Sequence, residues 1–245
     1  MSQSRPGRLP SLGDGLWGRR LLAGAVGAAV AALLAAGLFR LVAAEPHDLG
    51  FAVWVVTGLH LLSKRWRPRR DGRLRWHNRV AGRDAVEAGL VARRSLAGWV
   101  DLLGDALVTV AIAGALATVL PNEEWWGAAG RALLVASAAV LAGRAGYGAV
   151  RFTGRLALTA SGIRHGRRAY GWTNIDLVVP HRSDGRIDGV RLRPATWRST
   201  DPAPVVGGRD TAVPEERLVA AIEHFRHRPE TLAVGLPVTA PEPAG

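Results

Sequence analysis

Apolar and polar positions divide this chain into two unlike parts. Up to Val150, long apolar runs alternate with short charged patches, and beyond it the pattern is that of an ordinary soluble domain. Three runs, 21–44, 97–120 and 125–150, are long enough to cross a hydrocarbon core of about 30 Å as helices. A fourth run, 49–63, is shorter. It spans if its flanking groups reach the interface or the bilayer thins, and otherwise it is a buried or re-entrant segment. The pattern predicts a four-span α-helical transmembrane domain over 21–150.

The distribution of basic residues predicts the orientation of these spans. Arginines are concentrated in the N-terminal segment 1–20 and in the connection 64–96, whereas the connections 45–48 and 121–124 contain no Lys or Arg. By the positive-inside rule, both chain ends and the 64–96 loop are cytoplasmic. We therefore expect a multi-pass protein of the cell membrane. The alternative is a signal peptide cleaved after Ala44, but its apolar run exceeds the usual length of about 7–15 residues.

Composition and motifs exclude several kinds of chemistry. The chain has no cysteine, so disulfides and thiolate sites are absent. We find no Ser/His/Asp set, phosphate-cradling glycine loop or HExxH motif, so we expect a protein that is not an enzyme. His60 would need a second axial histidine to bind haem, and the other three runs contain none. His224 and His227 lack a third metal ligand. We expect no cofactor and no metal.

Basic residues in the 64–96 loop are interleaved with tryptophans. Such a segment beside a membrane is attracted to anionic headgroups, by about 1 kcal/mol for each basic residue. The net charge of +12 also raises nucleic acid as a partner, but the topology alone accounts for a basic loop here, so we expect no nucleic acid. The candidate headgroup contacts in this loop are Arg65, Arg67, Arg69 and Arg70.

Three ionisable residues lie near the cytoplasmic ends of the predicted third and fourth spans. Asp101 and Asp105 are one helical turn apart, and Arg144 lies at a similar depth in the next, antiparallel span. We expect an interhelical ion pair, or side chains that reach the nearby interface. The alternative function is a small ion-coupled transporter that uses these three residues, since ionisable groups inside membranes often carry ions or protons.

Small residues predict where the spans pack against one another. A stripe with a spacing of four residues runs along the first span, and glycines recur near the end of the fourth. These residues are Gly24, Ala28, Ala32, Ala36, Gly143, Gly146 and Gly148.

After Val150 the pattern predicts a small α+β domain. Apolar residues alternate from 156 to 159, "TASG" supplies a turn, and further short strands lead to a hairpin at "SDG". Pro214 opens a helix with Glu215 and Glu216 in its first turn. We expect an antiparallel sheet with a C-terminal helix over 151–236, followed by a disordered tail, 237–245.

The order of "LTASGI", "YGWTNI" and "PEERLVAAIEHFRHRPE" resembles that of bacterial pleckstrin-homology-like (PH-like) domains, which often accompany membrane spans in actinobacterial proteins. The match covers only 151–236, where we count four or five strands against seven in a complete barrel of that family. The matching residues are Thr159, Gly162, Ile163, Trp172 and Ile175.

The resemblance implies a binding or scaffolding module without catalysis. We expect it to bind anionic lipid headgroups at the inner membrane surface through Arg164, Arg167 and Arg168 of its first hairpin. A protein partner or a second copy of the chain is the other occupant that this kind of module allows.

Overall fold

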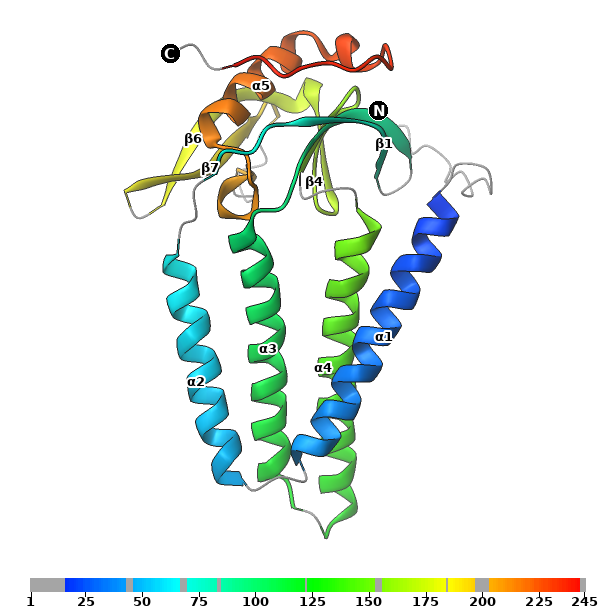
Figure 1. Ribbon diagram of the computed structural model, residues 1–245, viewed down its shortest axis with the longest axis vertical. Helices are drawn as coiled ribbons and strands as arrows, with labels where there is room; N and C mark the ends of the chain where they lie inside the picture. The colour runs from blue at the N-terminus through cyan, green and yellow to red at the C-terminus, as the bar shows by residue number, and fades with distance from the viewer. Residues whose placement is uncertain are drawn as a thin grey trace.

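Four helices form a bundle, and a β domain covers one end of it in the computed structural model (Figure 1). The structure describes residues 16–42, 46–66, 70–82, 85–121, 123–152, 156–183, 185–196 and 203–242. The bundle helices are α1 (Leu16–Val42), α2 (Pro46–Arg65), α3 (Leu96–Val119) and α4 (Trp125–Arg151).

Three of the bundle helices, α1, α3 and α4, are long and apolar enough to cross a membrane. They correspond to the three long apolar runs of the sequence. Helix α2 lies beside α3 and has 20 residues, which extends the predicted 49–63 run at both ends. At about 1.5 Å per residue its length is about 30 Å.

Helices α1 and α4 cross at a contact made by glycines. A Cβ on Gly143 would lie 2.8 Å from the carbonyl oxygen of Gly27, and a Cβ on Gly27 would lie 2.8 Å from the carbonyl oxygen of Gly143. Gly143 and Gly146 of α4 therefore do face α1, whereas nothing lies within 4 Å of a Cβ built on Gly148. The prediction for α1 was wrong, since its four stripe residues, Gly24, Ala28, Ala32 and Ala36, are exposed. A second stripe of small residues, offset by one position and containing Ala23 and Gly27, is buried instead.

The segment that we predicted to be a basic loop contributes two strands to the β domain. Strand β1 (Arg75–Ala81) pairs with β2 (Val86–Ala92), and β2 pairs with β3 (Leu156–Thr159). The sheet continues through β4 (Gly162–His165) to β5 (Arg168–Gly171) in the order β1-β2-β3-β4-β5, and all pairs are antiparallel. The domain is thus built from two chain segments separated by α3 and α4, and does not begin at residue 151.

A second sheet and the C-terminal helix complete the domain. Strand β6 (Ile175–Ser183) follows a 3-10 turn, Trp172–Asn174, and pairs with β7 (Arg186–Pro194), which pairs with β8 (Val205–Val206). After a second 3-10 turn, Gly208–Asp210, helix α5 (Glu215–His227) packs on β6 and β7. The shared core includes Leu90, Leu158, Ile163, Trp172, Leu192, Leu218, Ile222 and Phe225.

The "TASG" turn explains several of the residues that carry the family resemblance. Gly162 has φ of +147°, and a Cβ there would lie 2.1 Å from the carbonyl oxygen of Tyr170, so only glycine fits. The Thr159 hydroxyl donates to the Gly162 carbonyl at 3.0 Å, and the Trp172 indole donates to the Thr159 carbonyl at 2.8 Å. With Ile163 and Ile175, all five residues are buried.

The segment after Leu236 follows the β domain, although we predicted a disordered tail. A 3-10 turn, Pro229–Leu232, ends α5, and beyond it Val238 and Ala240 pack against the core. Glu242 lies 3.4 Å from the Arg73 guanidinium. We predicted disorder from the low hydrophobicity of the tail. That average does not show that two of its apolar side chains, Val238 and Ala240, pack against a core formed by the rest of the domain.

Candidate functional site

An open pocket of about 600 Å³ lies where the β domain meets the helices. It is lined by the connection between β2 and α3, the first turns of α3, the last turns of α4 and the turn between β4 and β5. Four of its lining residues are arginines, Arg93, Arg94, Arg144 and Arg167, and the described residues that line it include no Asp or Glu. We call it the junction pocket.

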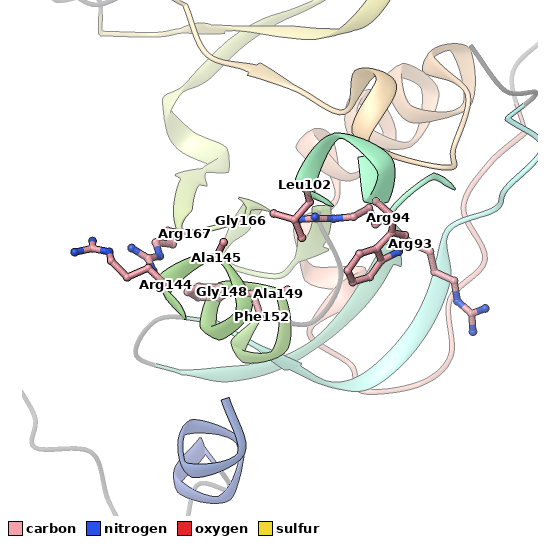
Figure 2. Close-up of a pocket in the computed structure, with 11 residues that line it drawn as sticks. Arg93, Arg94, Leu102, Arg144, Ala145, Gly148, Ala149, Phe152, Gly166 and Arg167 are labelled. Carbon is pink, nitrogen blue, oxygen red and sulfur yellow. The ribbon is translucent and has the colours of Figure 1, made fainter. Parts of the chain in front are cut away.

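The arginines come from three separate elements. Figure 2 shows Arg144 and Arg167 on one side of the junction pocket and Arg93 and Arg94 on the other. Arg93, Arg144 and Arg167 are exposed. Arg94 is partly buried, and its guanidinium lies over the Trp99 ring at 5.0 Å from the centroid. The four arginines therefore border one open space from three elements, and in Figure 2 the Arg93 side chain extends away from the labelled α4 residues.

The remaining lining of the junction pocket is apolar. It consists of Trp99 and Leu102 on α3, Ala145, Gly148 and Ala149 on α4, and Phe152. The small α4 residues leave room beside Leu102, and this part of the pocket lies along the membrane-length helices. The arrangement combines a cationic rim with an apolar wall.

Tryptophans occur at both ends of the bundle. Trp66 directly follows α2 and Trp99 lies in the first turn of α3, whereas Trp125 and Trp126 begin α4. The first two helix ends face the β domain and the start of α4 lies at the opposite end (Figure 1), and all four tryptophans are exposed. From Trp99 to the end of α3 at Val119, a helix rises about 30 Å, which is the thickness of a hydrocarbon core. Exposed tryptophans at such a separation are typical of the two membrane interfaces.

The three arginines predicted to contact headgroups in the first hairpin have different environments. Only Arg167 lines the junction pocket. Arg164 forms an ion pair with Glu87 of β2 at 2.7 Å, and its side chain is only 13% exposed. Arg168 is exposed and lines a smaller neighbouring pocket of about 170 Å³. The prediction is therefore wrong for Arg164, because β2 supplies a carboxylate that the sequence pattern did not place nearby.

Glu87 has a perturbed acidity in this ion pair. Burial acts to raise its pKa. The hydrogen bond from the Ser161 hydroxyl, at 2.8 Å, and the Arg164 charge act against burial, and together with hydrogen bonds from Thr159 and the Ser161 backbone they hold the pKa below its ordinary value. The Arg164 guanidinium also donates to the Val80 carbonyl at 3.2 Å. The pair joins β2 to β4 across the sheet and serves the structure of the domain.

Of the loop arginines predicted to contact headgroups, the structure describes two. Arg65 is exposed at the end of α2. Arg70 is paired with Glu215 at 2.5 Å and donates to the Gly208 carbonyl at 2.9 Å, so it holds the loop to α5 and does not face the membrane. Arg67 and Arg69 lie outside the described residues.

The predicted pairing of Asp101 or Asp105 with Arg144 is wrong. Asp101 pairs with Arg209 of the β domain at 2.9 Å, and Asp105 lies 3.0 Å from the imidazole of His60 on α2. His60 is 8% exposed and occupies space beside Gly104, where a Cβ would lie 2.1 Å from its Nδ1. Arg144 instead lines the junction pocket. The structure thus does not assemble the three charges on which the transporter alternative depends.

Arg209 fastens the β domain to two helices, and we call this contact the Arg209 clamp. Its guanidinium donates to Asp101 of α3 and to the carbonyls of Ser63 and Trp66 at the end of α2; the Trp66 distance is 3.2 Å. The Ser95 hydroxyl, which caps α3 by accepting from Gly98, donates to the Arg209 carbonyl. The clamp keeps the first turn of α3, and therefore one wall of the junction pocket, fixed to the β domain.

Sequence reasoning missed Arg93, Arg94, Trp99 and Arg209 as members of a common junction. Arg93 and Arg94 were visible only as part of a basic loop, and Arg209 lies in the segment "VVGGRD", which carries no recognised motif. The sequence does show two adjacent glycines, Gly207 and Gly208, which indicate a tight turn. Both have positive φ in the structure.

Comparison with known proteins gave no match: none to a protein family, none to a curated protein and none to a solved structure. Among the described residues, no group of three or more His, Asp or Glu side chains is arranged to hold a metal ion. The function must therefore be argued from the site itself.

Proposed function

We propose that this protein is a multi-pass membrane protein that binds an anionic phospholipid headgroup in the junction pocket. The observation that carries the proposal is the lining of that pocket: four arginines and no carboxylate among the described residues, beside helices long enough to cross a membrane. Guanidinium groups bind phosphate oxygens through paired, charge-assisted hydrogen bonds. The protein acts as a binding or assembly component without catalysis.

The proposal includes four spans with the β domain in the cytoplasm. The start of α1, the end of α2, the start of α3 and the end of α4 all lie at the β-domain end of the bundle (Figure 1), and the long basic connection is on that side. Reporter fusions after residue 242 and in the 121–124 connection test this orientation. We expect cytoplasmic activity from the first fusion and external activity from the second, and the reverse result would overturn the assignment.

The proposal also includes a PH-like domain. With β1 and β2, the described residues contain eight strands before α5, against the seven of a complete barrel, and the terminal helix packs on β6 and β7. The two strands of the 75–92 segment, which the resemblance did not cover, support this part of the proposal. We assign the lipid to the junction with the helices, since the hairpin arginine Arg164 is occupied by Glu87.

The binding test uses the full chain in a neutral detergent. Phosphatidylglycerol and the zwitterionic phosphatidylcholine are titrated separately, and native mass spectrometry counts the bound lipids. We expect phosphatidylglycerol to bind preferentially, and the double variant R144A/R167A to bind it at least about tenfold more weakly, since 1.4 kcal/mol corresponds to a factor of ten.

R168A is the matched control for this test. It removes the same charge from the same hairpin, but Arg168 does not line the junction pocket. The single variant R167A is measured beside it. If R168A weakened binding as much as R167A, the attraction would be a diffuse property of the basic surface, and the proposed site would be wrong.

A further inference from the structure

We infer that two copies of this chain pair within the membrane, with Asp105 of each copy bound to Arg144 of the other. The inference rests on the proposed membrane placement of α3 and α4, and it does not depend on a lipid in the junction pocket. It follows from the exposure of Asp105, from the common level of the two charges, and from the matching stripes of exposed residues to which they belong.

Asp105 is an exposed carboxylate on a helix of membrane length. Its side chain is 67% exposed, although one of its oxygens lies 3.0 Å from the His60 imidazole. Asp105 follows Trp99 by six residues, so it lies about 9 Å further along α3 than that exposed tryptophan. A carboxylate at this depth is costly, and an aspartate is too short to reach the interface, unlike a lysine or an arginine. We therefore expect a partner to cover Asp105.

Arg144 is the cation that fits this role. It is exposed on α4, and within the described part of the chain no hydrogen bond or ion pair joins its guanidinium to another residue. In Figure 2 its side chain extends away from Leu102 and from the α4 residues that line the junction pocket. The stem of Arg144 thus borders the pocket, whereas its guanidinium is free to meet an acceptor that another chain supplies.

Asp105 and Arg144 lie at the same level of the bundle. The register of the antiparallel helices α3 and α4 is fixed by three pairs of residues that lie together, Gly127 with Pro121, Ala138 with Val110, and Ala145 with Leu102. Extending this register places Asp105 level with Arg144 to within about one residue, a rise of about 1.5 Å. The two side chains nevertheless do not meet within one chain, because they leave their helices in different directions.

A two-fold axis along the membrane normal brings such charges together. Rotation about this axis keeps every residue at its own level, so charges that are level within one copy are also level between two copies. A contact of this kind is self-complementary, because the residues that one copy presents are the residues that it receives. The Asp105–Arg144 pair therefore forms twice in one dimer.

Each charge belongs to a stripe of exposed or partly exposed positions. The stripe on α3 is Asp105, Thr109, Ile112 and Leu116, and the stripe on α4 is Leu133, Ser137, Val140 and Arg144. Both stripes advance by four, three and four residues, which is the spacing of helices that pack side by side. In the antiparallel register, Thr109 is level with Val140, Ile112 with Ser137, and Leu116 with Leu133.

Both stripes lie on the side of the bundle that is turned away from α1. Helices α2, α3 and α4 form a row, and α1 lies in front of α4 (Figure 1). On α4, Gly143 faces α1; on α3, Gly104 faces α2, and Val110 joins a core cluster with residues of α1 and α4. At 3.6 residues per turn, both stripes point away from these contacts and toward the opposite side of the row. We call this surface, made of the two stripes, the α3–α4 face.

A second copy fits the α3–α4 face because the face is complementary to itself. Turned about the two-fold axis, the second copy sets its α4 stripe against the α3 stripe of the first, antiparallel and in register. Arg144 of each copy then covers the carboxylate of the other, and the apolar members of the stripes pack between the two charge pairs.

Crosslinking tests the predicted contact. The chain contains no cysteine, so introduced cysteines report only the chosen positions. Two full-length copies with different affinity tags are expressed together, one with T109C and the other with V140C, and the membranes are treated with a short thiol crosslinker. A product that carries both tags joins two copies, and we expect it for this pair.

The matched control replaces T109C with L107C. Leu107 is an exposed residue of α3 that lies two residues from Thr109, so its level is similar, but it points to a different side of the helix. We expect L107C with V140C to give no more product than samples with a single cysteine.

Substitution of the charges tests their role in the dimer. Full-length chains with a fluorescent label are diluted into phosphatidylcholine liposomes, and photobleaching steps count the copies that remain together. We expect D105N and R144Q each to raise the dissociation constant of the dimer at least about tenfold, as for the loss of interhelical polar contacts in a membrane. R168A removes an exposed arginine outside the α3–α4 face and should leave the dimer unchanged.

A charge exchange gives a second readout. The chain D105R/R144D carries the two charges on exchanged helices, so it should regain part of the association that each single substitution loses. Thermal melting confirms that every variant is folded. If the exchanged chain fails to fold, the crosslinking of T109C with V140C still decides the contact in chains that keep both charges.

The possible results overturn different statements. A monomer at every dilution, or equal crosslinking of the L107C control, would overturn the dimer, as would crosslinking of T109C to another protein but not to V140C. A dimer that D105N and R144Q leave unchanged would overturn the charge pair. Asp105 does not line the junction pocket. A monomer that still binds phosphatidylglycerol would therefore overturn this inference alone, and a dimer that binds none would overturn only the proposed function.

Discussion

Replacing Arg209 with alanine should loosen the β domain from the helices. The Arg209 side chain is 9% exposed, and that of its partner Asp101 is 20% exposed. The substitution removes the ion pair with Asp101 and two hydrogen bonds to carbonyls at the C-terminal end of α2, those of Ser63 and Trp66. The Ser63 carbonyl also accepts from the Trp66 backbone N–H at 3.0 Å, and Trp66 directly follows α2, so Arg209 caps this end of the helix.

The expected cost follows from these contacts. Removing one member of a buried ion pair costs about 3–5 kcal/mol, because the other charge remains without compensation. Water reaches Asp101 in part, so we reduce this to about 2–4 kcal/mol for R209A, or a fall in Tm of roughly 5–15 °C for a chain of this size. R209K keeps the charge but cannot reach all three acceptors, so we expect about half of this effect.

A double-mutant cycle measures the pair itself. Unfolding of the full chain in detergent is followed for wild type, R209A, D101N and the double variant, and the coupling energy should exceed about 1 kcal/mol. R193A is the matched control, since Arg193 is an exposed arginine of β7. A Tm for R209A within about 2 °C of wild type, or strictly additive effects of the two substitutions, would refute the reasoning.

Three further substitutions test the fold. The variant E87Q should be less stable than wild type near neutral pH, and the difference should shrink as pH falls below about 4. A carboxylate with a lowered pKa in the folded protein contributes stability that is lost as pH drops through that pKa. Melting curves at several pH values check this, and a difference independent of pH would contradict it. G143L should separate α4 from α1 at the contact between Gly143 and Gly27, and lower the free energy of unfolding by about 3 kcal/mol. The same melting assay measures this change, and an unchanged stability would exclude this crossing. G104V should destabilise α2 against α3 by about 1–3 kcal/mol through its clash with His60, and adding H60A should restore part of the loss if that clash is the cause.

The helices were predictable because their signals are local. The runs 97–120 and 125–150 agree with α3 and α4 to within one residue at each end, since an apolar length and the break at Pro121 determine both ends. The C-terminal helix followed from its Pro–Glu–Glu start and its apolar face. The choice between adjacent small-residue stripes on α1 could not be made from sequence, because both have the required spacing and only the position of α4 decides between them.

The β domain and the site were less predictable because their contacts are distant in the sequence. Strand β2 pairs with β3 across α3 and α4, with Leu90 opposite Leu158, and its own pattern, "VEAGLVA", resembles a weak helix face. Arg93, Arg144 and Arg167 come from three elements that meet only in the folded chain. The basic charge near the membrane was predictable, but its division between ion pairs, such as that of Arg164, and the open pocket was not.

The account depends most directly on a phospholipid headgroup in the junction pocket. An experimental density map of the full chain, purified in mild detergent from its native membrane, tests this without any added ligand. The proposed function predicts headgroup density in the junction pocket, in contact with the arginines that line it, with chain density continuing along α3 and α4 away from the β domain. A pocket that is closed by these side chains, or filled only by solvent, would contradict it.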